Sequence, residues 1–387
     1  MDDQWMVFSH YTERGWTVDN LWHIFTDFYG GQYAPLAFLS YLVLYAGFGY
    51  DPFYFHMFSL LLHIGCVCLV WKLISSLLRV HGGVSEKQIL YVNFITTLLF
   101  AVHPINVEAV AWISALKVLL YAFFYLLGLL CYLRYIRTSK IFYYVLTIGC
   151  FLCSFWGKEQ AVTFPLALLI VDWFTNRNMK NLEVWSEKMS FLIMAFFFGI
   201  ITVLSQGKGP YEMIFPLYQR LLFGCFALVE YITKSLLPVN LNFFYPFPIV
   251  LGEEPPLHYY LYPVVLLFLM GWIIAYRNNR YLVFGVLLFL VNLLFSIHLF
   301  NMSRHAIVAD RYMYLSYVGI AFLIANGIWW LRKRLSYFKA ALVFLFFYCF
   351  FLSVYTFHYT KKRENTTMVK KYTKEVLEKR LNGSNHL

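Results

Sequence analysis

The chain has 387 residues, of which 61% are hydrophobic, 21% are aromatic and 13% are charged, and its formal net charge is +11. The charged fraction is about half that of a soluble domain, and several apolar runs approach the roughly 17 to 25 residues that span a bilayer, so the composition excludes a soluble protein. Most Lys and Arg residues lie between the apolar runs, as membrane topology predicts, so the charge does not indicate nucleic-acid binding. We therefore predict an all-helical, polytopic integral membrane protein.

The first 51 residues do not read as a plain span. Acidic side chains such as Asp19 and Asp27 are interleaved with Trp16 and Trp22, a mixture that suits helices lying in the headgroup layer. The apolar stretch 33–49 is short and flanked by glycine, which predicts a re-entrant or surface helix. The expected domains are a first outer loop at 1–51, a transmembrane domain at 52–358 and a polar tail at 359–387.

About ten spans are predicted after this loop. Lys and Arg gather in alternate joints between them, including Lys188, and the positive-inside rule assigns these joints to the cytoplasm. The opposite joints carry the unusual polar residues, which we therefore expect on the outer face. The expected spans are 53–78, 88–103, 116–136, 141–157, 159–175, 190–206, 257–276, 281–300, 312–331 and 338–358.

Segment 217–237 is ambiguous between a span and a surface helix. Arg220, Glu230 and Lys234 fall within roughly 80° of one another around a helix. Such a charged stripe predicts a helix that lies along the outer surface or lines a cavity. Counting it as an eleventh span would move the tail to the cytoplasm; we favour ten, with one amphipathic helix in 360–387.

The stretch 98–120, LLFAVHPINVEAVAWISALKVLL, contains a polar elbow between two apolar helices. Proline has no N–H to donate and fits best in the first turn of a helix, so Pro104 should close one span and open a short amphipathic piece. His103 and Glu108 make this elbow a candidate for chemistry. The alternative is an interfacial hairpin anchored by Trp112.

Lys158 and Glu159 lie in FWGKEQAVTFP, between two apolar helices. Lysine is a good point-charge partner for phosphate, and a lipid phosphate is the anion most available at a membrane surface. The alternative is an ion pair at a turn whose lysine extends toward water.

Four ionisable residues, Arg304, His305, Asp310 and Arg311, lie in NMSRHAIVADRYMY just before an expected span. The two arginines could clamp a phosphate leaving group. Asp310 could instead serve only as a favourable partner of the helix dipole. The aromatic loop around 242–246, NFFYP, is predicted to be structural rather than catalytic.

Asp2 and Asp3 form an adjacent carboxylate pair at the start of the chain. Like charges close together raise one pKa, and a carboxylate can then take a proton from a hydroxyl group. The alternative is a flexible acidic terminus. The sequence contains no phosphate-binding P-loop, dinucleotide fingerprint, HExxH or serine-nucleophile elbow. The expected co-location of carboxylates, cations and interfacial aromatic residues at one leaflet favours an enzyme that acts on a lipid phosphate.

Several of these stretches resemble one family of membrane proteins. His103-Pro104 with the VEAVAWIS of 107–114 is similar to its HPxxVEAVAWISxRK signature. Lys158-Glu159 with AVTFP, the ADRYMYL of 309–315 and the NFFYP of 242–246 resemble its KExAVTLP, ADRYxYLP and LSxFYP elements, and Asp2-Asp3 with the QYAPL of 32–36 resembles its first-loop acidic pair and YxPLxxLS stretch. The family is that of the transmembrane and tetratricopeptide-repeat O-mannosyltransferases, within the GT-C superfamily of membrane glycosyltransferases.

The resemblance implies a GT-C-like helical bundle, a polyprenyl-phosphate sugar donor, transfer to a protein or glycan hydroxyl on the outer or luminal face, and a first-loop aspartate near the acceptor. Family members have a transmembrane helix before the acidic pair and repeats after the membrane region. The chain begins at the pair and stops about where the repeats should begin, so we expect both to be missing, and an inactive truncated fragment is one alternative.

The site that we expect combines these elements. Asp3, or Asp2, would act on the acceptor hydroxyl, and the basic residues would neutralise the departing phosphate. Glu108 and Asp310 would hold this basic group or the sugar, with His103 orienting the elbow. The full set is catalytic Asp2, Asp3, Glu108 and Asp310, donor-phosphate-binding Lys158, Arg304 and Arg311, and supporting His103, Glu159 and His305.

A divalent cation could bind where Asp2, Asp3 and Glu108 converge, although no ligand spacing requires one. The expected partners are membrane lipid, the polyprenyl-phosphate sugar and a protein or glycan acceptor, without nucleic acid. A transporter or flippase of lipid-linked sugars would use the same cations without needing the acidic pair. We expect a multi-pass protein of a bacterial cytoplasmic membrane rather than of the endoplasmic reticulum.

Overall fold

A computed structural model describes residues 3–206, 215–298 and 306–362. Within these ranges the regular structure is helical, and the only β-type pairings are two isolated bridges, Tyr29 with Gln32 and Pro246 with Ala306. The prediction of an all-helical protein is confirmed. The expected amphipathic helix in 360–387 lies almost wholly outside the described residues.

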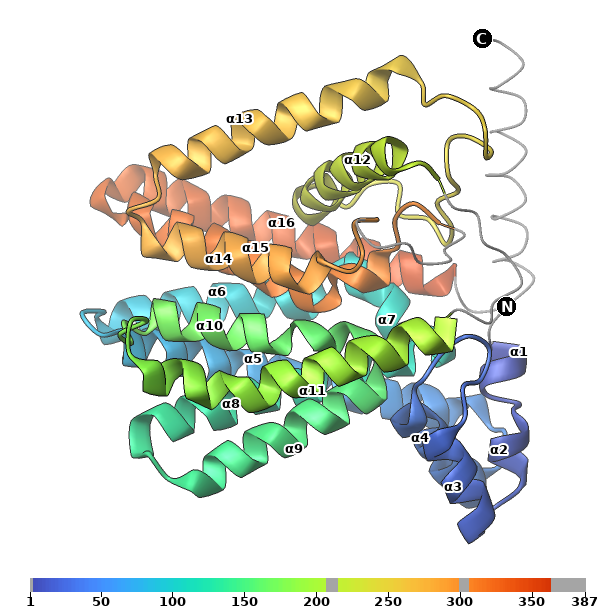
Figure 1. Cartoon of the computed structure of the whole chain (residues 1–387). Helices are drawn as coiled ribbons and strands as arrows, with labels where there is room; N and C mark the ends of the chain where they lie inside the picture. Colours follow the sequence, from blue (N-terminus) through green and yellow to red (C-terminus); the bar gives the residue numbers. More distant parts are fainter. Residues whose placement is uncertain (1–2, 207–214, 299–305, 363–387) are drawn as a thin grey trace.

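Long apolar helices connect two ends of the molecule, and most of them run side by side in a bundle (Figure 1). Where the connection between two consecutive helices is short, the helices run in opposite directions. These helices are α5 (Pro52–His81), α6 (Glu86–Val102), α8 (Leu116–Thr138), α9 (Ile141–Gly157), α10 (Phe164–Phe174), α11 (Leu182–Gln206), α13 (Leu261–Ala275), α14 (Arg280–Leu293), α15 (Met313–Trp330) and α16 (Leu335–Lys361).

Six helices of the described chain are long and apolar enough to cross a membrane, and α6 with the segment Pro104–Ala111 makes a seventh candidate bent by 50°. The chain is therefore a polytopic membrane protein. Two expected spans are shorter than predicted. The span at 159–175 opens with a 3-10 turn, η3 (Glu159–Thr163), which leaves 11 residues for α10, and the span at 281–300 ends its helix at Leu293. A count of ten spans stays a prediction.

Helix α13 shows the surface that this membrane environment requires. None of its residues is buried, and large apolar side chains such as Leu267, Phe268 and Trp272 are exposed. In water such a surface would be a strong association site, whereas in a bilayer it faces lipid.

Residues 3–48, within the segment predicted to be the first outer loop, form four short helices gathered at one end of the bundle (Figure 1): α1 (Asp3–Met6), α2 (His10–Glu13), α3 (Val18–Thr26) and α4 (Pro35–Phe48). The Tyr41 hydroxyl of α4 donates to the backbone oxygen of Ile113 at 2.9 Å, and the Phe25 ring of α3 lies 5.2 Å from that of Trp156 in α9. The loop is thereby fixed on the same end of the bundle as the elbow that follows α6.

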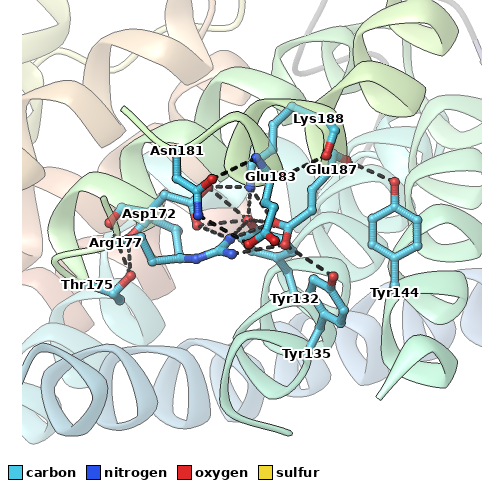
Figure 2. Close-up of polar contacts among 12 residues, drawn as sticks. Tyr132, Tyr135, Tyr144, Asp172, Thr175, Arg177, Asn181, Glu183, Glu187 and Lys188 are labelled. Carbon is cyan, nitrogen blue, oxygen red and sulfur yellow. Dashed lines mark hydrogen bonds and ion pairs between the residues drawn. The ribbon is translucent and has the colours of Figure 1, made fainter. Parts of the chain in front are cut away.

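A polar cluster ties α8, α10 and α11 together at the opposite end (Figure 2). Lys188 has no exposed surface; its ammonium lies 2.5 Å from Asp172 Oδ2 and also donates to the Tyr132 hydroxyl. Arg177 makes two parallel hydrogen bonds to Glu187, at 2.6 and 2.9 Å, which raise the pKa of its guanidinium above the usual value. We had predicted that Lys188 would be a cation in a short joint between spans. It belongs instead to this buried network.

Removing one charge from this cluster is expected to destabilise the protein. Lys188→Met would leave the buried Asp172 without its nearest cation, which should lower the free energy of unfolding by about 3 kcal/mol. Asp172→Leu together with Lys188→Met removes both charges and should recover much of the loss. Thermal unfolding in detergent measures both variants; a single variant as stable as the wild type would contradict this assignment.

Candidate functional site

The elbow after α6 is built as Pro104 predicts. Helix α6 ends at Val102, the 3-10 turn η1 (Pro104–Asn106) follows, and α7 (Val107–Ala111) continues at an angle of 50°. His103 caps η1, because its Nδ1 accepts a hydrogen bond from the Ile105 amide at 3.2 Å, and its ring lies 4.2 Å from that of Tyr317. His103 thus lies at the joint of the elbow, and its role in orienting it stays a prediction.

Glu108 joins this elbow to the start of α15. Its side chain is 2% exposed and accepts two hydrogen bonds from Arg311, one from Nη1 at 2.7 Å and one from the backbone amide at 2.8 Å. Arg311 belongs to the 3-10 turn η5 (Asp310–Tyr312), which leads into α15. Charge-assisted bonds to both carboxylate oxygens fix the guanidinium and the turn against α7.

The ring of Tyr312 brings a second cation to the same place. Lys158 Nζ lies 4.9 Å from the ring centroid and the Arg311 guanidinium carbon lies 5.1 Å from it; Arg311 also lies 5.3 Å from the Trp112 ring. Lys158 is only 3% exposed, so its ammonium does not extend into water as the alternative reading required. Three sequence stretches that lie far apart in the chain thus meet at Arg311 and Tyr312.

Asp310 has no exposed surface, and its side chain does not share the Glu108 contact of Arg311. Its Oδ1 accepts from the Tyr245 hydroxyl at 3.0 Å, and its Oδ2 accepts from Tyr359 at 3.5 Å. The N-cap residue of η5 is Ala309. The carboxylate is therefore held by two phenols. We had predicted the NFFYP loop to be structural rather than catalytic, and the sequence did not indicate this contact.

Lys234, from the charged stripe on α12 (Leu217–Leu236), also contacts this region. Lys234 is 6% exposed; its ammonium lies 3.6 Å from Glu230 and 4.5 Å from the centroid of the Tyr245 ring. Helix α12 is not among the described helices apolar enough to span a membrane. The stripe was the sequence signal for a site-lining helix, but it could not indicate that Tyr245 would be the contact.

The start of the chain lies beside the elbow. Helix α1 packs against the 3-10 turn η2 (Ile113–Ala115), and the Lys117 ammonium contacts Met6 Sδ at 3.9 Å and donates to the Gln32 side chain. Asp3 is the first residue of α1, and only its backbone is described. Asp2, Arg304 and His305 lie outside the described residues, and Glu159 is the half-buried first residue of η3.

The comparisons with known proteins agree with the motif resemblance. No family model matches the chain, and no solved structure matches it. Protein O-mannosyl-transferase TMTC2 of Mus musculus is 32% identical over 189 residues, which are 44% of this chain and 21% of the relative. The Homo sapiens TMTC2 is 33% identical over the same shares, and Tmtc3 of Drosophila melanogaster is 28% identical over 40% of this chain and 18% of its own length.

The chain therefore covers about a fifth of the length of these curated relatives. All three are animal proteins, so they do not support the bacterial membrane that we had expected. The chain is a membrane protein. Over nearly half of its length its sequence is similar to those of animal protein O-mannosyl-transferases.

Proposed function

We propose that the chain is a membrane glycosyltransferase that moves a sugar, by analogy with its relatives a mannose, from a polyprenyl-phosphate donor to a hydroxyl group of a protein or glycan. The observation that carries this proposal is the pairing of Lys158 and Arg311 on the ring of Tyr312, beside the buried Glu108. Two buried or half-buried cations at one end of a membrane bundle suit an anion that arrives in the bilayer. A lipid phosphate is such an anion.

The reaction is a single displacement at the anomeric carbon. The acceptor oxygen forms a bond to this carbon as the bond from the carbon to the donor phosphate oxygen breaks, and the bonding electrons leave with the phosphate. Asp3, or Asp2, takes the acceptor proton. Lys158 and Arg311, joined by Arg304, neutralise the charge that develops on the phosphate, where fixed cations in a site of low dielectric stabilise the transition state most.

The remaining residues orient these groups. Glu108 fixes the guanidinium of Arg311, and Asp310 anchors the same turn from its other side. His103 caps the elbow, while Glu159 and His305 flank the two basic stretches. In this account Glu108 and Asp310 act on the basic group and not directly on the sugar.

A divalent cation does not suit the described part of this site. Both carboxylate oxygens of Glu108 accept hydrogen bonds from Arg311, and no three His, Cys, Asp or Glu side chains in the described ranges are grouped to hold a metal. In the proposed mechanism the basic residues neutralise the phosphate.

The proposed orientation places this end of the bundle on the outer or luminal face, in a eukaryotic membrane. The loops at the other end carry Arg and Lys clusters such as 332–334 and 137–140, as a cytoplasmic face should. With ten spans, the proposed domains are the outer loop at 1–51, the GT-C-like transmembrane domain at 52–358 and the tail at 359–387.

Reconstitution of the purified chain with a radiolabelled polyprenyl-phosphate mannose tests the function directly. We expect the label to move to a serine- or threonine-containing peptide acceptor. Label that crosses the bilayer still attached to its lipid would instead identify a flippase and contradict the transferase proposal.

Lys158→Met is expected to raise the KM for the donor about tenfold, the size of one desolvated cationic contact. The variant keeps an unbranched chain of similar length over Tyr312 but loses the charge. Lys140→Met, in a loop at the opposite end of the bundle, is the matched control. Equal donor KM values for Lys158→Met and the wild type would remove Lys158 from the phosphate site.

A further inference from the structure

The loop after α12 holds the segment that leads into η5. The backbone amide of Ile307 donates to the carbonyl of Tyr245 at 2.9 Å, and Pro246 forms an antiparallel bridge with Ala306. Two segments about sixty residues apart are thus paired just before the turn that carries Asp310 and Arg311. Tyr245 is the residue of the loop at which this pairing is centred.

The hydroxyl of Tyr245 has a defined direction. It accepts a hydrogen bond from the Asn242 amide at 2.7 Å, so its own proton is available for Asp310 Oδ1, 3.0 Å away. Burial, and then the nearby Asp310 carboxylate, raise the pKa of the Tyr245 hydroxyl well above its usual value. The group therefore stays protonated at neutral pH and donates to the carboxylate.

The ring of Tyr245 connects the same loop to α12. The Lys234 ammonium lies 4.5 Å from the ring centroid, and one turn earlier on α12 the Tyr231 hydroxyl accepts a hydrogen bond from the Ala309 amide at 3.2 Å. Helix α12 thereby contacts the N-cap residue of η5 directly and Asp310 of η5 through Tyr245. Lys234 of the charged stripe therefore packs against protein, a contact that a side chain facing lipid could not make.

These contacts hold η5 from two sides. Glu108 binds the amide and guanidinium of Arg311, while Tyr245 binds the carboxylate of the preceding residue, Asp310. Consecutive residues anchored to α7 and to the α12 loop leave the turn little freedom. The direction of the Arg311 side chain depends on both anchors.

We propose that Tyr245 is a positioning residue, which fixes Asp310 and thereby aims Arg311 at the phosphate of a lipid-linked donor. This inference rests on the proposed function. Tyr245 touches neither the donor nor the acceptor in this account, so its removal should weaken donor recognition more than the chemical step.

Tyr245→Phe tests the inference, because it keeps the ring under Lys234 and removes only the hydroxyl. We expect the donor KM to rise about tenfold, the usual effect of losing one hydrogen bond to a charged group, with the acceptor KM unchanged. A purely structural role would lower the amount of active protein, and hence kcat, without changing the donor KM. Tyr348→Phe is the matched control, since the Tyr348 hydroxyl donates to the backbone oxygen of Leu236 at 2.8 Å; it should behave as the wild type.

Binding of farnesyl phosphate, a short polyprenyl monophosphate, provides a readout that does not need turnover. Tyr245→Phe should weaken this binding about tenfold in a calorimetric titration. If the wild type binds and Tyr245→Phe binds equally well, the positioning role alone is overturned. If the wild type does not bind farnesyl phosphate, the proposed phosphate site fails, and the positioning role fails with it.

A double-mutant cycle separates coupling from general damage. If Tyr245 acts through Asp310, adding Tyr245→Phe to Asp310→Asn should weaken binding no further than Asp310→Asn alone. Losses that multiply would show two independent effects and overturn the inference. Because Tyr245→Phe keeps the aromatic ring, we expect this variant to fold. Thermal unfolding of each variant measures whether its stability is retained.

Discussion

Arg311→Lys is expected to lower donor-dependent transfer at least about a hundredfold, the lower end of what the loss of one preorganised charge-stabilising donor removes from kcat. Lysine keeps the charge, but it cannot make the planar contacts of Arg311 with Glu108 and with the rings of Trp112 and Tyr312. The measurement is kcat/KM for a labelled polyprenyl-phosphate sugar in reconstituted vesicles.

Arg332→Lys is the matched control for this variant. Arg332 also lies over an aromatic ring, with its guanidinium carbon 4.4 Å from the Trp329 centroid, but at the opposite end of the bundle. It should leave transfer unchanged. Similar losses in the two arginine variants would mean that the effect comes from anchoring in the membrane and not from the site.

Asp3→Asn should reduce transfer by about a hundredfold or more, because asparagine cannot take the proton from the hydroxyl group of the acceptor. General-base catalysis typically contributes at least that much. The adjacent Asp2 could take over part of this role, so the double variant Asp2→Asn with Asp3→Asn should lose more than the single one. The single variants and the double variant are compared in the same labelled-sugar assay.

Asp19→Asn controls for the loss of an acidic residue from the first outer loop, since Asp19 is an exposed residue of α3 that pairs only loosely with His23 at 3.5 Å. It should leave turnover unchanged. If the double variant turns over as fast as the wild type, the acidic pair is not the base. The proposed transfer mechanism would then have no base.

Local sequence signals predicted much of the candidate site. Pro104 marked the elbow because proline cannot continue an apolar helix, and the positions of Lys158 and Arg311 between apolar runs indicated a cationic site at one membrane end. Glu108 accepts two hydrogen bonds from Arg311, whereas its role in a phosphate site stays a prediction. The role of Tyr245 was missed, since an aromatic loop has no pattern that indicates which carboxylate it will meet.

Helix α11 shows why hydropathy misplaced some boundaries. We predicted its span at 190–206, but the helix begins at Leu182, because Glu187 and Lys188 are paired with Arg177 and Asp172 inside the protein. A hydropathy window counts these charges as expensive, whereas their partners come from α10 and the following loop and are invisible to it. Similarly, the 3-10 turn η3 shortens the helix at 159–175 without any change in apolar composition.

The most direct measurement is a structure of the protein with farnesyl phosphate bound, which locates the phosphate group. Our account predicts the phosphate within hydrogen-bonding distance, about 3 Å, of the Lys158 ammonium and the Arg311 guanidinium, on the side of the bundle that carries α1. A phosphate bound instead among the arginines and lysines at the opposite end would contradict the proposed site.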